Sequence, residues 1–449
     1  MNKNHNNTES SDDSKRVTVI GGGLSGLSTA VFLAKIGFKI NLYEASPKLG
    51  GRTYSFFDNA IGGYIDNGQH ILASWYHNTF DYLKLIGTYD KLFFQKRLEV
   101  NFRDRNAEVF PLKASKLPPP LHLLKGLMSY KMLNLNDRVS AIKLINTIKS
   151  DKISDEVIRG INVNTLFEDT KQTAGIIENF WKPFIIAVFN AVPEDTSAFM
   201  FKQIIKTGFL EKGGSNLVLP DVFLSELLTD PAEKYLTDKG SIVITNKKIS
   251  KINVREDNVT SIIAEDNAEI KSDYYVSAVG FFDINNLLIG SNVLMEKEQL
   301  LTSPIVNIHL KFDRDITGII KNRFEGILSS NIQWVFRVKN DQVCIVISSA
   351  KKIAEMEKEA VLELCKGELY KCYPELKNVN ITGSRVLKEM RATFLPDKRS
   401  INIRPKCRTS LKNLYLAGDW TDTGLPATIE SAVKSGKICS KEIIHDSIK

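Results

Sequence analysis

Residues 16–26 read RVTVIGGGLSG, and this stretch decides the fold of the chain. Its first five residues are mostly β-branched, which is typical of a buried parallel strand. Glycines follow with the G-x-G-x-x-G spacing, and apolar and small residues then recur at helical spacing over residues 27–36. A strand, a glycine turn and a helix in this order predict a Rossmann-like dinucleotide-binding unit.

Each position of this motif has a physical role in holding a dinucleotide. Gly21 permits the tight turn, Gly23 lets the backbone approach a pyrophosphate, and Gly26 lets the helix pack against the strand. The helix N-terminus, at Leu24 and Ser25, carries a partial positive charge and is expected to face the phosphates.

A second strand is predicted over residues 38–43, and it ends in Glu44. Glu44 stands 18 residues after Gly26, close to the spacing of about 20 residues at which a carboxylate binds the ribose hydroxyls. We therefore expect Glu44 and the adjacent Ala45 to belong to the dinucleotide site.

The turn after this strand contains Gly50, Gly51 and Arg52. A Gly-Gly-Arg soon after the ribose carboxylate resembles the FAD-binding branch that includes the amine oxidases and the carotenoid desaturases. In that branch the Gly-Gly turn passes close to the flavin, and the arginine lies on the pyrophosphate side. The resemblance implies that the dinucleotide is FAD rather than NAD.

A second motif lies near the end of the chain, where residues 414–419 read LYLAGD. This strand pattern, ending in Gly418 and Asp419, resembles the second FAD motif of the same superfamily, in which the aspartate accepts a hydrogen bond from the ribityl chain. The last helix is expected to open around Ala427, Thr428 and Ile429, with its positive N-terminus facing the N1–C2=O edge of the flavin.

The two motifs lie almost 400 residues apart, so the sequence predicts a discontinuous FAD-binding domain. The expected fold class is α/β, with a Rossmann-like FAD-binding domain from residues 15–72, 237–290 and 400–449. Residues 73–236 and 291–399 are assigned to an α+β substrate domain. Residues 1–14 are polar and are predicted to be a disordered tail rather than a secretory signal.

Hydrophobic periodicity predicts the elements between the motifs. Short strands are expected over residues 241–244, 249–254, 259–264, 274–278 and 305–310. Resemblance to the superfamily places Ile249 in the strand beneath the adenine, although plain sheet core is an alternative for this residue. Helical spacing dominates residues 72–236, and helices are predicted over 79–86, 137–149, 187–207 and 353–370.

Four sequence blocks point to one family within this superfamily. They are residues 66–72 (DNGQHIL), 180–183 (FWKP) with Asn190, 214–220 (GSNLVLP) and 417–428 (AGDWTDTGLPAT). Together these blocks resemble the hydroxysqualene dehydroxylases, squalene-associated FAD-dependent proteins of bacteria within the flavin amine oxidase and phytoene desaturase superfamily. One departure is Glu430-Ser431, where that family usually has Glu-Gly.

The resemblance implies a reaction and its residues. Hydroxysqualene, a C30 isoprenoid alcohol, would lose its hydroxyl and gain a hydride to give squalene, in bacterial squalene, hopanoid or other C30 isoprenoid biosynthesis. Gly68 would contact FAD, and Gln69 and His70 would lie near the flavin, with His70 the first candidate for protonating the leaving hydroxyl. A role in orienting the loop stays open for His70. Trp181 and Asn190 are candidates for shaping the substrate pocket, with core packing the alternative for Trp181.

The composition of the chain indicates which partners besides FAD it can have. The net charge of +8 suits an anionic membrane, and it equally suits a protein without charged partners. Residues 111–131 combine an apolar stretch with lysines, which predicts either a peripheral membrane contact or a helix packed on the core. No apolar run could span a bilayer. We expect a cytoplasmic protein that can rest on the inner face of the membrane, a hydrophobic isoprenoid substrate, squalene-pathway synthases as partners, and neither nucleic acid nor a metal site.

Other function classes stay open on the sequence alone. A carotenoid or diapocarotenoid desaturase of the phytoene type would use the flavin in the oxidising direction. A lipid-binding protein without catalysis would tend to lose the flavin motifs, which are intact here. An amine oxidase would need an aromatic cage, for which the second motif offers only Trp420. No second dinucleotide fingerprint is visible, so the source of electrons is not indicated.

Overall fold

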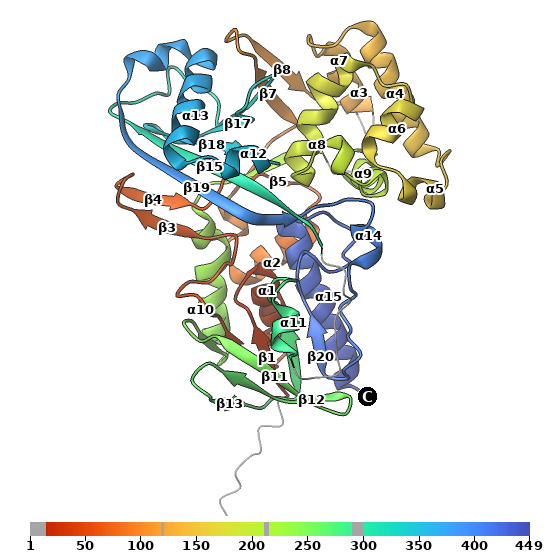
Figure 1. Ribbon diagram of the computed structural model, residues 1–449, viewed down its shortest axis with the longest axis vertical. Coiled ribbons are helices and arrows are strands. Elements are labelled where there is room, and N and C mark those ends of the chain that lie inside the picture. The colour runs from red at the N-terminus through yellow and green to blue at the C-terminus, as the bar shows by residue number, and fades with distance from the viewer. Residues whose placement is uncertain (1–14, 118–120, 211–214, 290–299) are drawn as a thin grey trace, which may run out of the picture.

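The computed structural model describes residues 15–117, 121–210, 215–289 and 300–449 (Figure 1). The predicted tail, residues 1–14, lies outside the described residues. In the view of Figure 1, the lower half of the molecule is built on a five-stranded sheet and the upper half on a seven-stranded sheet. Both halves combine sheets with helices, which is the α/β fold that the sequence predicts.

A parallel sheet in the order β10-β2-β1-β14-β20 organises the lower half. Each of the three segments assigned to FAD binding contributes to it: β1 pairs in parallel with β2 and β14, β10 pairs with β2, and β20 pairs with β14. Its strands are β1 (Arg16–Ile20), β2 (Lys39–Tyr43), β10 (Ile242–Ile244), β14 (Tyr274–Ser277) and β20 (Leu414–Leu416).

The two faces of this sheet are covered differently. Val19 and Leu42 belong to the buried cluster formed with the helices, whereas Tyr275 and Leu416 belong to the cluster that includes Ile252 of an antiparallel sheet. The helices of the lower half are α1 (Leu24–Ala34), α2 (His77–Ile86), α10 (Asp230–Asp238), α11 (Ile284–Leu287) and α15 (Ile429–Ser447). The antiparallel sheet consists of β11 (Ile249–Arg255), β12 (Asn258–Ala264) and β13 (Glu269–Ile270).

A larger sheet in the order β19-β15-β18-β17-β16-β7-β8 organises the upper half. One of its faces is buried under α12 (Lys351–Glu355) and α13 (Lys358–Cys372). Its strands are β7 (Glu99–Arg103), β8 (Val109–Lys113), β15 (Thr302–Phe312), β16 (Phe324–Ile327), β17 (Trp334–Lys339), β18 (Gln342–Ile347) and β19 (Ile381–Phe394).

A lobe of helices, drawn in yellow tones in Figure 1, lies beside this sheet. It contains α3 (Leu121–Ser129), α4 (Leu135–Lys149), α5 (Asp155–Gly160), α6 (Val163–Asp169), α7 (Ala174–Ile176), α8 (Lys182–Phe189) and α9 (Ala198–Ile205). Small sheets of β3 (Ser55–Asp58) with β4 (Gly63–Asp66), and of β5 (Leu72–Ala73), β9 (Leu217–Pro220) and β6 (Leu92–Phe94), join the two halves, and α14 (Ser400–Ile403) leads back to β20. Short 3-10 turns occupy Tyr89–Lys91, Pro193–Asp195 and Pro374–Asn378, and π-helical turns occupy Ile177–Trp181, Lys206–Leu210 and Ser225–Thr229.

Two element predictions were wrong. The helix predicted over residues 187–207 is broken, because Asn190 takes a left-handed conformation with φ of 51° and Pro193 then begins a short turn. The helix predicted over residues 353–370 is broken because the backbone is extended at Met356. Residues 72–236 are mostly helical, as predicted, and they also form the short strands β5 to β9, of which β7 and β8 complete the upper sheet.

Candidate active site at the junction of the two halves

The glycine turn after β1 meets the Gly-Gly turn of residues 50–51. The amide of Gly50 donates to the carbonyl oxygen of Gly22 at 2.9 Å. A Cβ added to Gly23 would meet only the Cα of Gly51, at 3.9 Å, so the backbone is open at this point. Leu24 and Ser25, the first residues of α1, line the same cavity. An open backbone beside a helix N-terminus is suited to a pyrophosphate.

Glu44 lies at the end of β2 and is held in place by two backbone amides. Its Oε2 accepts from the amide of Gly22 at 2.6 Å, and its Oε1 accepts from the amide of Ser46 at 2.8 Å. Glu44 and Ala45 both line the cavity, as does Ile249 at the start of β11. The predicted ribose and adenine residues therefore lie on one side of the glycine turn.

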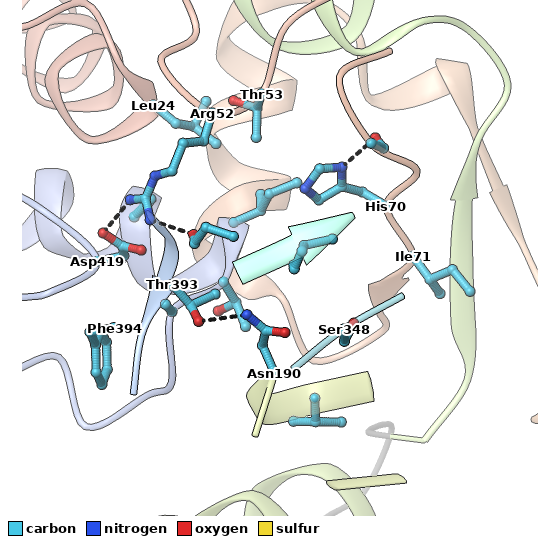
Figure 2. A pocket seen from close by; sticks show the side chains of 18 of the residues that line it. Leu24, Arg52, Thr53, His70, Ile71, Asn190, Ser348, Thr393, Phe394 and Asp419 are labelled. Atoms are coloured by element: carbon cyan, nitrogen blue, oxygen red, sulfur yellow. Dashed lines mark hydrogen bonds and ion pairs between the residues drawn. The ribbon is translucent and has the colours of Figure 1, made fainter. Parts of the chain in front are cut away.

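The two sequence motifs are joined by an ion pair. Arg52 Nη2 lies 2.7 Å from Asp419 Oδ1, and Arg52 Nη1 donates to the carbonyl oxygen of Ala392 at 2.7 Å (Figure 2). The charge of Asp419 raises the pKa of Arg52 above its ordinary value. Arg52 therefore donates to Asp419, the residue that is expected to accept a hydrogen bond from the ribityl chain.

The N-terminus of α15 opens onto the cavity. Thr428 is the N-cap, and its hydroxyl accepts from the amide of Ser431 at 3.1 Å. Ala427, Thr428 and Ile429 line the cavity together with Gly418. The N-terminus of α15 would therefore direct its partial positive charge at the flavin of a bound FAD.

These residues fit FAD. The fit rests on the open backbone at Gly23, the two helix N-termini of α1 and α15, and the carboxylate of Glu44. Gly21 also lines the cavity, and its φ of 107° is the conformation of the tight turn. Gly26 does not line the cavity, and an added Cβ there would lie 2.0 Å from the carbonyl oxygen of Gly21. The role of Gly26 is to let α1 approach β1 closely.

Gly68, Gln69 and His70 form a loop on the opposite wall of the cavity. His70 Nδ1 lies 2.9 Å from the carbonyl oxygen of Gly68, and Gln69 Nε2 donates to Asp66 Oδ2 at 3.4 Å. Burial lowers the pKa of His70 below its ordinary value. The imidazole is therefore mostly neutral near pH 7, with Nδ1–H donating to Gly68 and Nε2 left as an acceptor.

The lowered pKa of His70 allows a test of whether this residue protonates the leaving hydroxyl. A residue that donates a proton must first carry it, and burial makes the imidazolium scarce at neutral pH. If His70 protonates the leaving hydroxyl, kcat should rise as the pH is lowered below 6.5, and a His70→Gln variant should lose this rise. A pH profile that is the same in both proteins would contradict the assignment.

Asn307, on β15, supports this loop from the upper sheet. Its Nδ2 donates to the carbonyl oxygen of Asn67 at 3.0 Å. The side chain leaves no room for a Cβ on Gly68, which would lie 2.9 Å from Nδ2. The sequence did not indicate Asn307, because a single asparagine in a strand makes no recognisable pattern.

Asn190 and Trp181 line the cavity, but their polar atoms are already bonded within the protein. Asn190 Nδ2 donates to Thr393 Oγ1 at 2.9 Å (Figure 2). It also donates to the carbonyl oxygen of Ser303, and Asn190 Oδ1 accepts from the amide of Ser349 at 2.6 Å. Trp181 Nε1 donates to Gln172 Oε1 at 3.0 Å, and the indole ring packs against the rings of four phenylalanines, Phe167, Phe180, Phe184 and Phe201. Both residues can shape the wall, whereas neither offers a free polar group to a ligand.

One cavity of about 1330 Å³ is bordered by Gly21, Gly23, Glu44, Arg52, Gly68–His70, Asn190 and Asp419. Small-molecule sites usually measure roughly 300–1,000 Å³, so this cavity has room for more than one ligand. Beyond the motif residues it continues between the upper sheet and the helical lobe. The walls there are largely apolar, and include Leu98, Val100, Phe102, Leu123, Leu127, Ile145, Phe180, Phe184, Trp334 and Phe336.

Asp66 precedes the loop of Gly68, Gln69 and His70 and is only 5% exposed. Its carboxyl group makes the stability of the folded protein depend on pH. Burial raises its pKa to about 6, although Ser55 Oγ and the Leu224 amide donate to it at 2.6 and 2.9 Å. The folded state therefore holds this proton more tightly than the unfolded chain. The resulting stability is fully present below pH 4 and is lost as the pH rises through 6, by at most about 3 kcal/mol.

The test is urea unfolding of an Asp66→Asn variant between pH 4 and pH 7. The free energy of unfolding of the unmodified protein, relative to the variant, should fall by up to about 3 kcal/mol over this range. Exposed Asp90 provides the matched control, because Asp90→Asn should follow the unmodified protein at every pH. Parallel curves for the Asp66 variant would show that Asp66 does not titrate in this range.

Comparison with known proteins agrees with this geometry. The family model of flavin-containing amine oxidoreductases matches residues 24–444. Hydroxysqualene dehydroxylase of Rhodopseudomonas palustris is 30% identical over 432 residues, which is 94% of this chain and 97% of the relative. Hydroxysqualene dehydroxylase of Zymomonas mobilis is 28% identical over 424 residues, covering 93% and 96%. The chloroplastic 15-cis-phytoene desaturase of Solanum lycopersicum is 26% identical over 462 residues, covering 96% and 78%.

Solved structures share the fold. An oxidoreductase from Methanosarcina mazei superimposes with a TM-score of 0.73 at 16% identity, over 94% of this chain and 99% of that one. A putrescine oxidase superimposes with a TM-score of 0.68 at 14% identity, over 96% and 99%. The chain therefore belongs to the flavin-containing amine oxidoreductases and, among them, to the hydroxysqualene dehydroxylase family, and it is an FAD-dependent oxidoreductase.

Proposed function

We propose that this enzyme removes the hydroxyl of hydroxysqualene and delivers hydride to the same carbon skeleton, giving squalene. The observation that carries the proposal is the cavity, which runs from the FAD motifs into an apolar chamber. A C30 hydrocarbon alcohol is bound by apolar surface along nearly its whole length, with one polar group to be placed beside the flavin. The relatives named hydroxysqualene dehydroxylase support this choice of substrate.

The reaction balances with reduced FAD as the electron donor. The C–O bond breaks, a C–H bond forms with hydride that reduced FAD supplies when bound, and a proton turns the leaving hydroxyl into water. The apolar chamber walls, among them Phe180, Phe184 and Trp334, exclude water from the carbocation formed when the C–O bond ionises. Gln69 and His70 offer the polar groups that can orient the hydroxyl.

The test is anaerobic turnover of hydroxysqualene by purified protein with chemically reduced FAD, with squalene followed by mass spectrometry. Squalene should form well above a control that contains reduced flavin without protein. Squalene at the level of this control would overturn the proposal.

A phytoene-type desaturase is the second candidate, and the relatives named 15-cis-phytoene desaturase favour it. Such an enzyme would accept electrons from its substrate rather than donate them. The same protein, given phytoene and oxidised FAD, separates the two functions. Oxidation of phytoene together with no action on hydroxysqualene would establish the second candidate in place of the first.

We also propose that α3 rests on an anionic membrane surface. Leu117, Leu121 and Met128 are between 41% and 49% exposed, and Lys116 and Lys125 are exposed beside them. Leu123, Leu124 and Leu127 of the same helix line the cavity, so α3 lies between the cavity and the surface. Among the described residues no helix is long and apolar enough to cross a membrane, so this contact would be peripheral.

Vesicle flotation tests the membrane contact. The protein should float with vesicles that contain phosphatidylglycerol, and less with pure phosphatidylcholine. A Leu121→Asp, Met128→Asp variant should stay in the soluble fraction. The exposed residue Val157, on α5, gives the matched control, because Val157→Asp should float like the unmodified protein. Equal flotation of both variants would contradict the proposal.

A further inference from the structure

Arg404 is a buried cation whose bonds converge on one loop. It follows α14 and is 6% exposed. Four of its hydrogen bonds measure 2.9 to 3.3 Å. The acceptors are the carbonyl oxygens of Asp419, Trp420, Thr421 and Leu425 and the hydroxyl of Thr423.

These acceptors are neutral. Within the described part of the chain, no carboxylate oxygen lies within ion-pair distance of Arg404, and the ring of Phe394 lies 4.6 Å from the guanidinium carbon. Burial lowers the pKa of Arg404 to about 10, so the group is charged at neutral pH. A buried charge without a direct ion pair is destabilising, and the carboxylates of Asp422 and Asp419 act on Arg404 only from beyond ion-pair distance.

The loop that Arg404 holds belongs to the FAD site. Asp419 and Trp420 line the cavity, and Asp419 also forms the ion pair with Arg52. The far end of the loop, at Leu425, leads into the N-terminus of α15. Arg404 therefore ties together both ends of the segment that connects β20 to the helix facing the flavin.

Ser431 stands where the hydroxysqualene dehydroxylases usually have glycine, and its side chain adds hydrogen bonds to the same loop. It is fully buried, its Oγ donates to the carbonyl oxygen of Asp419 at 3.2 Å, and it shares a hydrogen bond of 2.6 Å with Thr423. The conformation of the loop is thus specified from two sides, by Arg404 and by Ser431.

We propose that Arg404 is a positioning residue for FAD, because it sets the shape of the loop from Asp419 to Leu425. Its guanidinium lies behind the cavity-lining residues Asp419 and Trp420, and its positive charge favours the electron-rich reduced flavin. This inference rests on the FAD site and is independent of which isoprenoid is the substrate. Loss of the guanidinium should weaken FAD binding and also lower the reduction potential of the bound flavin.

The test compares Arg404→Met and Arg404→Lys with Arg103→Met, measuring FAD affinity and the midpoint potential of the bound flavin. Arg103 is the matched control, because its guanidinium is largely buried against Glu325 of the upper sheet, 2.7 Å away, and does not line the cavity. Arg404→Met should bind FAD at least about tenfold more weakly and prefer reduced over oxidised FAD about tenfold less, which corresponds to a potential lower by about 30 mV for two electrons. Arg404→Lys keeps the charge but cannot reach all the acceptors, so its affinity should fall while its potential changes less.

Three results would overturn the proposal. The first is unchanged affinity and potential in folded Arg404→Met. The second is an equal loss of FAD affinity in Arg103→Met, since that would reflect general destabilisation. If the methionine variant does not fold, the lysine variant carries the test, and FAD affinity equal to that of the unmodified protein is the third overturning result.

Discussion

Replacing Gly26 with alanine is expected to abolish tight FAD binding. Gly26 lies in α1, and an added Cβ would stand 2.0 Å from the carbonyl oxygen of Gly21. That atom is backbone, so it cannot rotate away as a flexible side chain would. Relief requires α1 to move off β1, and overpacking of this kind costs typically about 1–3 kcal/mol. A cost of about 3 kcal/mol borne by the FAD-bound form would weaken binding by about a hundredfold.

The affinity of the variant for FAD, together with the visible absorbance of oxidised flavin that remains bound after purification, measures this loss. Gly367→Ala is the matched control, because Gly367 is also inside a helix, α13, but an added Cβ meets nothing within 4 Å. That substitution should leave FAD binding unchanged and stabilise the protein by up to about 1 kcal/mol. A Gly26→Ala protein that retained its flavin would mean that α1 can shift without disturbing the site.

Replacing Glu430 with alanine is expected to destabilise the folded protein by about 3 kcal/mol or more, because several buried donors lose a charged acceptor. Glu430 is 2% exposed. Its Oε1 accepts from the amide and the side chain of Asn78, and its Oε2 accepts from the amide and the hydroxyl of Thr79. These donors form the N-terminus of α2, so the carboxylate also meets the positive end of that helix.

The free energy of unfolding in urea measures this effect. Glu442, on the same helix, is the control: its carboxylate pairs with Arg408 at the surface, and Glu442→Ala should cost less than about 1 kcal/mol. Glu430→Gln keeps one acceptor oxygen and should fall between the two. Equal stability of the two alanine variants would show that the buried bonds of Glu430 do not tie α2 to α15 as described.

Much of the cofactor site could be predicted, because it is built from short local patterns. The strand, turn and helix around Gly21 and the strand end at Gly418 each specify their own conformation within a few residues. The predicted strands that complete the lower sheet are confirmed by its parallel pairing. The end of α8 was harder to predict from the sequence. Asn190 ends this helix in a left-handed conformation, and its side chain is held there by hydrogen bonds to three other segments of the chain.

By itself the sequence determined the dinucleotide fingerprint, the identity of the family and the positions of both motifs, since glycine spacing and strand–helix periodicity are local properties. Only the tertiary structure decided which groups meet across the chain. Arg52 pairs with Asp419 across 367 residues, Asn307 supports the Gly68 loop, and Arg404 holds the loop before α15. Such contacts depend on how separate elements pack, which leaves no pattern in a single sequence.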